Sequence, residues 1–405
     1  MNRRTPSTPA GRAVAINEWV RTAQVPLLRG ILEMAQTDDV ISFALGLPAP
    51  ECLPTEAYAR ACATVLAEDP EALQLGPPFE PLKRHIAGLM KCRGVECTPE
   101  EIVITTGAQQ ALDLVARLLV PVGSQVAVEE TTFHGVLQAV SPYGTEVLAI
   151  RSDCENGIDT NDLEALLKRG VRPAFLYVIP DGHNPTGACM VGESRRRLVR
   201  LAHEYGMPIV EDDAYGLLSY GSLAEAPLRS LDREMVFSIG SFSKILAPAL
   251  RLGWIVIPVR FRSAFSILRD LAEVDAVSFT QRAVSALFDS GAFPNHLAGL
   301  RNTYQRRRDA LLRTLQESLA GRARWCVPKA GFFIWLRLPE MVDTEQLFGT
   351  AVTSAKVAYA PGSAFCTTRQ ARAKHCLRLS FSHAPVDRFD DGIRRLARVI
   401  EKQGG

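Results

Sequence analysis

The feature that most constrains this chain is a regular alternation of short apolar segments and amphipathic segments between residues 101 and 258. Apolar runs of strand length alternate with segments of helical periodicity, several of which stop at Gly. The predicted strands lie at 101–107, 124–130, 145–150, 174–180, 207–213, within 235–244, and at 251–258, and the predicted helices at 108–119, 132–144, 161–170 and 192–206. This alternation is typical of a mostly parallel sheet with helices on both faces, so the predicted fold class is α/β. Active sites in such sheets lie at the carboxyl ends of the strands.

The pattern changes near residue 262, where the chain turns helical and then returns to strand-like segments before a last helix from about Asp390 to Lys402. This second pattern is typical of an α+β unit. A chain of 405 residues has room for two domains. We therefore expect an N-terminal arm over 1–50, a large domain over 51–290 and a smaller C-terminal α+β domain over 291–405.

Charge and composition argue against several classes of partner. The 46 basic residues are balanced by 44 acidic ones, and a net charge of +2 gives no field for nucleic acid or an anionic membrane. No run of about 18 apolar residues occurs, and the N-terminus lacks the apolar core of a secretory signal. Nine cysteines without a Cys-x-x-Cys pair, and histidines without a His-Glu-x-x-His motif, make a disulfide framework or a metal site unexpected. A reducing cytoplasm fits this cysteine usage.

Lys244 is the residue that most suggests chemistry. It is one of only eight lysines, and it lies just past a strand end among Ser241, Ser243 and Arg251. A lysine amine with a lowered pKa forms a Schiff base with an aldehyde, and two hydroxyls with an arginine suit a phosphate. An aldehyde that carries a phosphate describes pyridoxal phosphate (PLP). A surface lysine in a Ser-rich turn is the alternative interpretation.

Other strand ends carry groups that suit the same cofactor. The strand–Gly–helix segment 102–111 presents free backbone amides at Ala108 and Gln109, a ready anion site, although ordinary strand–helix turns look alike. Asp212 ends a buried strand, where a carboxylate could keep a pyridine nitrogen protonated and make the ring an electron sink. Tyr215 could then bond the ring hydroxyl. Capping of a helix is the alternative role for the acidic pair at 212–213.

Two further residues suit a substrate. Asn184, held before a proline in the turn PDGHNPTG, is a rigid amide, although turn chemistry alone explains the Pro and Gly. Arg378 alternates with leucines in a strand, and an inward-facing Arg needs an anionic partner such as a substrate carboxylate. An outward-facing strand Arg is the alternative.

In combination these segments resemble the fold-type-I PLP enzymes of aminotransferase class I/II. The nearest branch contains 2-aminoadipate and kynurenine aminotransferases and the aminotransferase-like domain of MocR regulators. The resemblance runs from about Leu27 to the C-terminal helix, with these landmarks in family order: ISFALGLP, VITTGAQQAL, HNPTG, EDDAY, SFSK with Arg seven residues on, PKAGFFIW and LRLSFS.

The resemblance implies roles for individual residues. Lys244 matches the Schiff-base lysine and Asp212 the pyridine-nitrogen carboxylate, while Arg378 matches the α-carboxylate clamp and Gly46 the N-terminal segment that closes over the substrate. Asn184 and Tyr215 match the ring-hydroxyl donors. The phosphate ligands are matched by Ala108, Gln109, Ser241, Ser243 and Arg251, and the aromatic stacking on the ring by Phe133. The resemblance also implies a homodimer with sites at the subunit interface.

Two departures from the family pattern concern the pocket. A family Tyr whose hydroxyl reaches the phosphate of the neighbouring subunit is replaced by Leu75, in a segment, LQLGPPFEPLKRH, that is shorter than usual. The stacking residue in EETTFHG is Phe133 rather than the usual Tyr, so its ring lacks a hydroxyl. These changes keep the cofactor chemistry but put the outcome of the reaction in question.

The sequence therefore predicts a PLP-dependent aminotransferase that moves the α-amino group of an amino acid to a 2-oxo acid through an aldimine with Lys244. The alternative is β- or γ-elimination, replacement or cyclisation of an activated amino acid such as S-adenosylmethionine. A PLP-binding DNA regulator is a third class; it needs a winged helix-turn-helix ahead of the domain, and only a short segment precedes the resemblance here.

Overall fold

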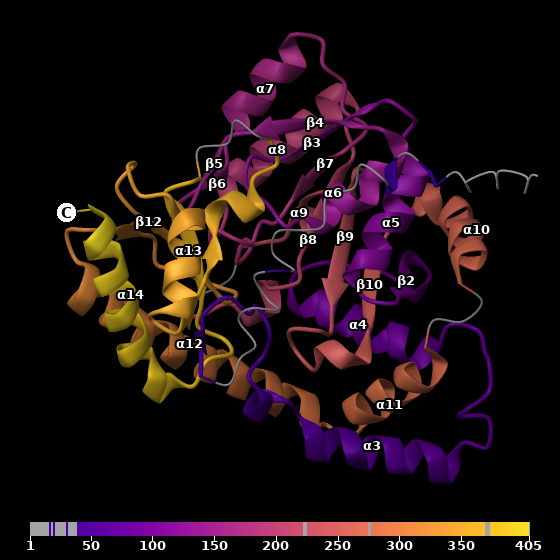
Figure 1. The fold of residues 1–405 in the computed structure, drawn as a ribbon. Helices are drawn as coiled ribbons and strands as arrows, with labels where there is room; N and C mark the ends of the chain where they lie inside the picture. The colour runs from indigo at the N-terminus through magenta and orange to yellow at the C-terminus, as the bar shows by residue number, and fades with distance from the viewer. Residues whose placement is uncertain are drawn as a thin grey trace, which may run out of the picture.

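The structure is a computed structural model of the chain, and it describes residues 39–404 apart from 222–224, 274–276 and 369–372, with a few isolated residues before 39. The N-terminal arm expected over 1–50 thus lies mostly outside the described residues. Figure 1 shows two parts side by side, a large helix-flanked sheet and a smaller C-terminal unit around α12 and α14.

The large part is built on a mixed sheet of seven strands in the order β2-β10-β9-β8-β7-β3-β4. The strands are β2 (Ile102–Thr105), β3 (Gln125–Glu129), β4 (Glu146–Ile150), β7 (Leu176–Val178), β8 (Ile209–Asp212), β9 (Val236–Ser241) and β10 (Gly253–Val256). All neighbours run parallel except β10, which is antiparallel to both β2 and β9. The predicted α/β class with a mostly parallel sheet is confirmed.

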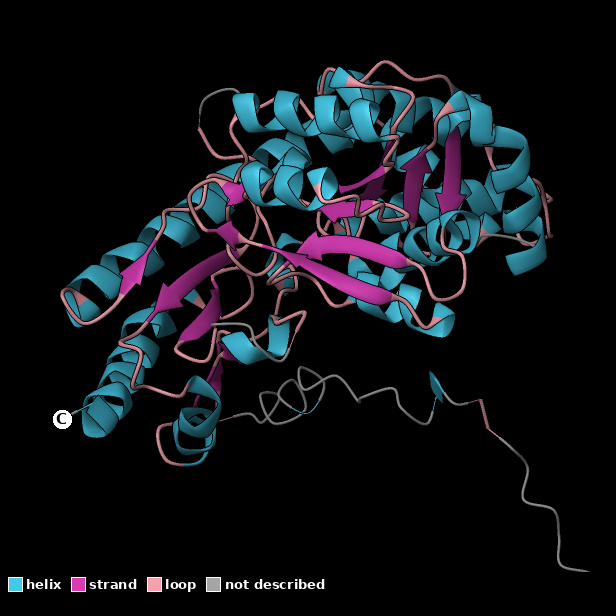
Figure 2. Cartoon of the chain, turned by 90° about the horizontal axis from the view of Figure 1, so that it is seen from above, coloured by secondary structure: helices cyan, strands magenta, loops and turns pink. Residues whose placement is uncertain are grey.

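Helices cover both faces of this sheet (Figure 2). One face packs on α5 (Ala108–Leu119), α6 (Gly135–Val140) and α10 (Arg262–Ala272), and the other on α7 (Thr160–Lys168), α8 (Gly192–Tyr205) and α9 (Leu228–Leu231). Successive strand residues serve opposite faces: Tyr177 packs with the first set, whereas Leu176 and Val178 pack with the second. The strands are therefore buried on both sides, which explains their nearly continuous apolar sequence.

A third layer lies against the β2 edge. It consists of α3 (Thr55–Glu68), α4 (Glu80–Cys92) and α11 (Ser278–Asp289), and Figure 1 shows α3 and α11 side by side. The long helix α12 (Ala292–Leu319) leads from this layer into the C-terminal part.

The C-terminal part holds an antiparallel sheet in the order β11-β12-β15-β14. Its elements are β11 (Arg324–Trp325), β12 (Phe333–Arg337), α13 (Thr344–Thr353), β13 (Val357–Ala358), β14 (Ala360–Pro361), β15 (Cys376–Ser380) and α14 (Phe389–Gly404). The predicted C-terminal strands and last helix are thus present. The strand β1 (Ile41–Ser42) pairs in parallel with β13, so the segment around residue 41 is attached to the C-terminal part.

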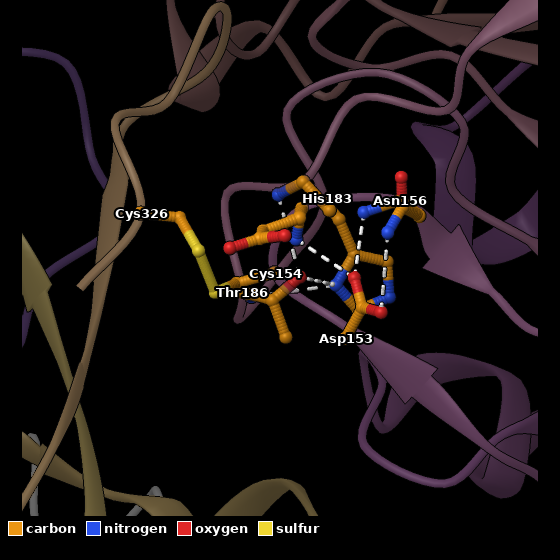
Figure 3. The surroundings of a disulfide bond; sticks show 8 residues. Asp153, Cys154, Asn156, His183, Thr186 and Cys326 are labelled. Carbon is orange, nitrogen blue, oxygen red and sulfur yellow. Dashed lines mark hydrogen bonds between the residues drawn. A yellow bond between two sulfur atoms is a disulfide. The ribbon is translucent and has the colours of Figure 1, made fainter. Parts of the chain in front are cut away.

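A disulfide joins the two parts, although no pattern in the sequence predicts one; the other seven cysteines are free, so the bridge is a single one and no framework. Cys154 lies between β5 (Ser152–Asp153) and β6 (Gly157–Ile158) of the large part, and it bonds Cys326, which follows β11 (Figure 3). The two cysteines are 172 residues apart in sequence. Their spacing carries no signal, because only the packing of the two parts brings them together.

The bridge lies in the wall of a cavity of about 830 Å³ between the two parts, which Thr186, Trp325 and Trp335 also line. Within the described residues, no helix is both long enough and apolar enough to cross a membrane.

Candidate active site

The carboxyl end of β8 places Asp212 inside the molecule. The Asp212 side chain is only 5% exposed, and its Oδ2 accepts a hydrogen bond of 2.7 Å from the hydroxyl of Tyr177 on the adjacent strand β7. The backbone N–H of Ala214 donates to Oδ1 at 3.3 Å. Burial raises the pKa of the Asp212 carboxyl, and the Tyr177 hydrogen bond opposes that rise. Asp212 therefore caps no helix and has two neutral donors.

Lys244 lies three residues beyond the end of β9, in the loop that leads to β10. Its Nζ donates to the backbone carbonyl of Gly46 at 2.8 Å and lies 5.9 Å from the centre of the Tyr215 ring. Burial, together with the positive charge of Arg378, lowers the pKa of Lys244 to about 8, although Asp212 opposes the shift. An amine with this pKa is neutral in a much larger fraction at mildly alkaline pH than an ordinary lysine, and the neutral form is the one that attacks a carbonyl carbon.

Arg378 faces inward from β15, with 3% of its side chain exposed. Its Nη1 donates to Asn184 Oδ1 at 2.7 Å and its Nη2 to the carbonyl of Ala44 at 2.6 Å. The guanidinium also lies over the Phe333 and Phe365 rings, 4.2 and 4.7 Å from their centres. Its Nε is buried without a partner among the described residues.

The electrostatic state of Arg378 follows from these contacts. Both of its hydrogen-bond acceptors are neutral, and burial lowers its pKa to about 10. A buried cation without a counter-charge is costly unless an anion binds it. A bound carboxylate would supply that charge.

The Arg251 side chain lies where α5 begins, at the place of the predicted phosphate cradle. A Cβ on Gly107 would lie 2.7 Å from Arg251 Nη2, and one on Gly253 would lie 3.0 Å from the backbone N of Ala108. The Arg251 guanidinium therefore lies beside Gly107, the residue just before the free amides of the helix N-terminus, and this arrangement suits an anion. Gly107 has φ of +78°, which favours glycine at this turn.

The neighbouring predicted ligands border the same cradle. Gln109 Nε2 donates to the carbonyl of Gly135 at 2.9 Å, and a Cβ on Gly135 would collide with the Phe133 ring. Phe133 is thus packed beside the start of α5. Ser241 and Ser243 lie together at the end of β9, where the N–H of Ser243 donates to Ser241 Oγ at 3.2 Å.

These groups fit a pyridoxal phosphate. A lysine of lowered pKa, a buried carboxylate, an aromatic ring and an arginine at a helix N-terminus lie along one edge of the sheet. They supply a partner for the aldehyde, for the pyridine nitrogen, for the ring face and for the phosphate.

The comparisons with known proteins agree with this fit. The family described as "Aminotransferase class I and II" matches residues 39–396, most of the chain.

This chain belongs to the class I and II aminotransferases.

Named relatives cover nearly the whole aminotransferase chain. The "Aromatic-amino-acid aminotransferase 1" of Thermococcus litoralis is 36% identical over 93% of this chain and 91% of its own. The structure of Pyrococcus horikoshii kynurenine aminotransferase, in complex with PMP, has a TM-score of 0.90 and 33% identity over 96% of this chain and 98% of its own. That of the α-aminoadipate aminotransferase LysN from Thermus thermophilus, complexed with N-(5'-phosphopyridoxyl)-L-leucine, has a TM-score of 0.87 and 34% identity over 96% and 97%. The predicted family, PLP-dependent transferase activity and cofactor are confirmed.

The structure brings the predicted residues of this aminotransferase together and adds groups that the sequence interpretation missed. Tyr177 lies in the apolar strand β7, and nothing in the sequence indicates that its hydroxyl bonds to Asp212 on the adjacent strand. Missed too were Arg93, Asp181, Arg195 and Asp213, which form a buried network of ion pairs beside Asp212. Leu75 lies outside the cluster in this single chain, with a 75% exposed side chain. The described residues contain no group of three or more His, Cys, Asp or Glu that could hold a metal ion.

Proposed function

We propose that this aminotransferase moves the α-amino group of an amino acid to a 2-oxo acid, with Lys244 as the residue that bonds PLP. The observation that carries the proposal is the convergence of the partly buried Lys244 with the buried Asp212 and Arg378, three ionisable groups from three different parts of the chain.

Each residue has a task in this proposal. Bound PLP supplies an electron-poor ring that stabilises negative charge at the substrate Cα. Lys244 Nζ acts first as a base, which takes the proton from the substrate Cα, and then as an acid, which would deliver that proton to the carbon C4′ of the cofactor. Arg378 and Asn184 bind the substrate carboxylate and so orient the Cα–H bond. With PLP bound, Asp212 would face the pyridine nitrogen and Tyr215 the ring hydroxyl, and Phe133 would stack on the ring.

The remaining residues bind the phosphate of the cofactor and cover the substrate. Ala108, Gln109, Ser241, Ser243 and Arg251 hold the phosphate, and the segment around Gly46, whose carbonyl accepts from Lys244, closes over the substrate. The aromatic rings beside Arg378 support an amino acid with a large side chain, as do the relatives named for aromatic amino acids and kynurenine.

We also propose a cytoplasmic homodimer with the division 1–50, 51–290 and 291–405. The family resemblance supports the dimer, and the exposed side chain of Leu75 is available to reach a second subunit. The position of α12 between the large part and the small sheet supports a boundary near 291.

A half-reaction tests the proposed function. Holoenzyme is mixed with single amino donors, among them aromatic amino acids, kynurenine, 2-aminoadipate and S-adenosylmethionine, and the cofactor absorbance is followed in a stopped-flow instrument. Transamination converts PLP stoichiometrically to pyridoxamine phosphate, and a 2-oxo acid then restores the original spectrum. An elimination or replacement enzyme would recover its spectrum without an oxo acid, and that outcome would overturn the proposal. Lys244→Ala, which lacks the proposed base, is the control.

A further inference from the structure

Tyr177 is a buried polar residue for which the reaction described so far has no task. It lies in the middle of β7, its side chain is 0% exposed, and its hydroxyl is 2.7 Å from Asp212 Oδ2. In the parallel register Tyr177 stands beside Val210, two residues before Asp212 on the same face of β8. The tyrosine side chain thus extends along the sheet to the strand end where Asp212 lies.

Asp212 differs from the neighbouring carboxylate, Asp213, in the kind of side chain that bonds to it. The next residue, Asp213, is paired with the Arg93 guanidinium, whereas the described hydrogen bonds to Asp212 come from Tyr177 and from the backbone N–H of Ala214. Of these two, the Tyr177 bond is shorter, 2.7 Å against 3.3 Å. Tyr177 therefore donates to the Asp212 carboxylate as Arg93 donates to the Asp213 carboxylate, but it adds no positive charge.

We propose that Tyr177 is a positioning residue of the aminotransferase, whose hydroxyl holds the Asp212 carboxylate in its anionic form and turned toward the cofactor ring. The inference rests on the proposed role of Asp212 at the pyridine nitrogen. An arginine in this place would compete with the pyridinium for the carboxylate, whereas a neutral donor fixes one oxygen and leaves the negative charge available.

The charges around the pair are consistent with a permanent donor. Burial raises the pKa of Tyr177 far above its usual value, and the negative charge of Asp212, Glu129 on β3 and Tyr215 raise it further, so the hydroxyl keeps its proton. Asp212 is faced by Tyr177 from β7, by its neighbour Asp213 and by Lys244 from the loop after β9. Asp213 opposes ionisation of Asp212, and Lys244 and Tyr177 favour it.

Tyr177→Phe tests the proposal, because it deletes the hydroxyl and keeps the ring that fills the core. Because a hydrogen bond to a charged group contributes more than one between neutral groups, we expect Tyr177→Phe to lower kcat about 10- to 100-fold. The KM for the amino donor should change less than about threefold. The PLP dissociation constant, measured by absorbance titration of the full-length apoprotein, should rise. The acidic limb of the kcat–pH profile should move to higher pH, since the Asp212 pKa rises when its donor is lost.

Tyr359→Phe is the matched control. Tyr359 is also 0% exposed, and its hydroxyl donates at 2.7 Å, but to the backbone carbonyl of Thr344 in the C-terminal part. This variant loses a buried hydroxyl of the same kind and should keep the wild-type kcat, PLP affinity and pH profile. Thermal melting of both variants reports their common structural cost.

A double-mutant cycle separates the possible outcomes. In an Asp212→Asn background, adding Tyr177→Phe should change kcat less than about twofold, because Tyr177 acts through the carboxylate that is already gone. If Tyr177→Phe melts like Tyr359→Phe and keeps wild-type kcat, PLP affinity and pH profile, the proposal is wrong and the proposed function stands. If Asp212→Asn itself is fully active, the proposed role of Asp212 is wrong and the proposal for Tyr177 fails with it, whereas the half-reaction with an amino donor tests transamination independently.

Discussion

Two groups of buried or partly buried charges lie next to each other at the carboxyl edge of the large sheet, and they are built in opposite ways. The group we call the counterion cluster consists of Arg93, Asp181, Arg195 and Asp213. The group we call the active cluster consists of Asp212, Lys244 and Arg378. Asp212 and Asp213 are consecutive in the sequence, yet one belongs to each cluster.

In the counterion cluster every charge has an opposite charge in contact. Arg195 grips both oxygens of Asp181 at 2.7 and 3.1 Å, and Arg93 bridges Asp181 and Asp213 at 2.8 and 3.3 Å. Burial alone would lower the pKa of Arg93, but the adjacent carboxylates of Asp213 and Asp181 raise it above its usual value. Burial would likewise raise the pKa of Asp181, and the two arginines bring it below its usual value. Asp213 is the exception in the counterion cluster, because burial keeps its pKa raised in spite of Arg93.

In the active cluster the shifts run opposite to those of Arg93 and Asp181. Burial lowers the pKa of Lys244 to about 8 and that of Arg378 to about 10, and it raises the pKa of Asp212. These three groups are arranged for charges that a ligand brings, a carboxylate for Arg378 and a ring nitrogen for Asp212. Perturbed groups without internal compensation mark a functional site, whereas compensated groups mark the structure that supports it.

Breaking the counterion cluster should have the largest effect on stability. Arg93→Met leaves the buried Asp213 without its cation, so the free energy of unfolding should fall by about 3–5 kcal/mol in denaturant titrations. The exposed pair of Arg394 and Asp390, at positions i and i+4, provides the control, because Arg394→Met should cost no more than about 0.5 kcal/mol. A loss below about 1 kcal/mol for Arg93→Met would contradict the difference between the clusters.

The matching change in the active cluster should affect function rather than stability. Arg378→Met should lower kcat/KM for the amino donor by about 30- to 5,000-fold, because the substrate carboxylate loses its buried charged partner. Stability should stay within about 1 kcal/mol of wild type, since a buried cation with only neutral acceptors contributes little. The variant should keep its PLP spectrum, and loss of that spectrum would mean that Arg378 serves the cofactor instead.

The same variant makes a pH prediction. The positive charge of Arg378 lowers the pKa of Lys244, so its removal should raise that pKa above about 8. PLP combines with the neutral amine, so the pH midpoint for cofactor capture by the apoprotein should move upward. A midpoint that stays where it is would contradict the electrostatic coupling within the active cluster.

The disulfide joins the two parts covalently, and it contains no residue of either cluster. Cys154→Ser should lower the free energy of unfolding by about 2–4 kcal/mol under oxidising conditions and leave kcat unchanged. Unfolded, unreduced wild-type protein should show seven reactive thiols out of nine cysteines. Nine reactive thiols would contradict the bridge. Cys92→Ser, which removes an exposed free thiol, is the control.

Leu75 lies outside the active cluster, and its substitution should have the smallest effect on PLP affinity and turnover. If Leu75 shapes a pocket for the substrate in a partner subunit, Leu75→Tyr should leave PLP affinity unchanged and lower turnover, because a hydroxyl enters an apolar wall. If the missing hydroxyl only weakens phosphate binding, PLP should bind tighter by about 0.5–1.5 kcal/mol. We predict the first result; tighter PLP with undiminished turnover would contradict it.

The sequence predicted the sheet and the active cluster better than the groups that support them. The alternation of strands and helices and the short motifs at strand ends are local patterns, so they could be recognised without a structure. Tyr177 could not, because its hydroxyl is hidden in an apolar strand and meets Asp212 only across the sheet. The Cys154–Cys326 bridge and the partners of Arg93 depend on packing between distant segments, which leaves no periodic trace in the sequence.

The central claim is that Lys244 is the residue that the active cluster prepares for PLP. Holoenzyme reduced with borohydride, digested and sequenced by mass spectrometry tests it directly, because reduction fixes the cofactor to the lysine it occupies. The account predicts a pyridoxyl group on Lys244 and its absence from the other seven lysines. A label on any other lysine, or a visible PLP band of wild-type intensity in Lys244→Ala, would contradict the account.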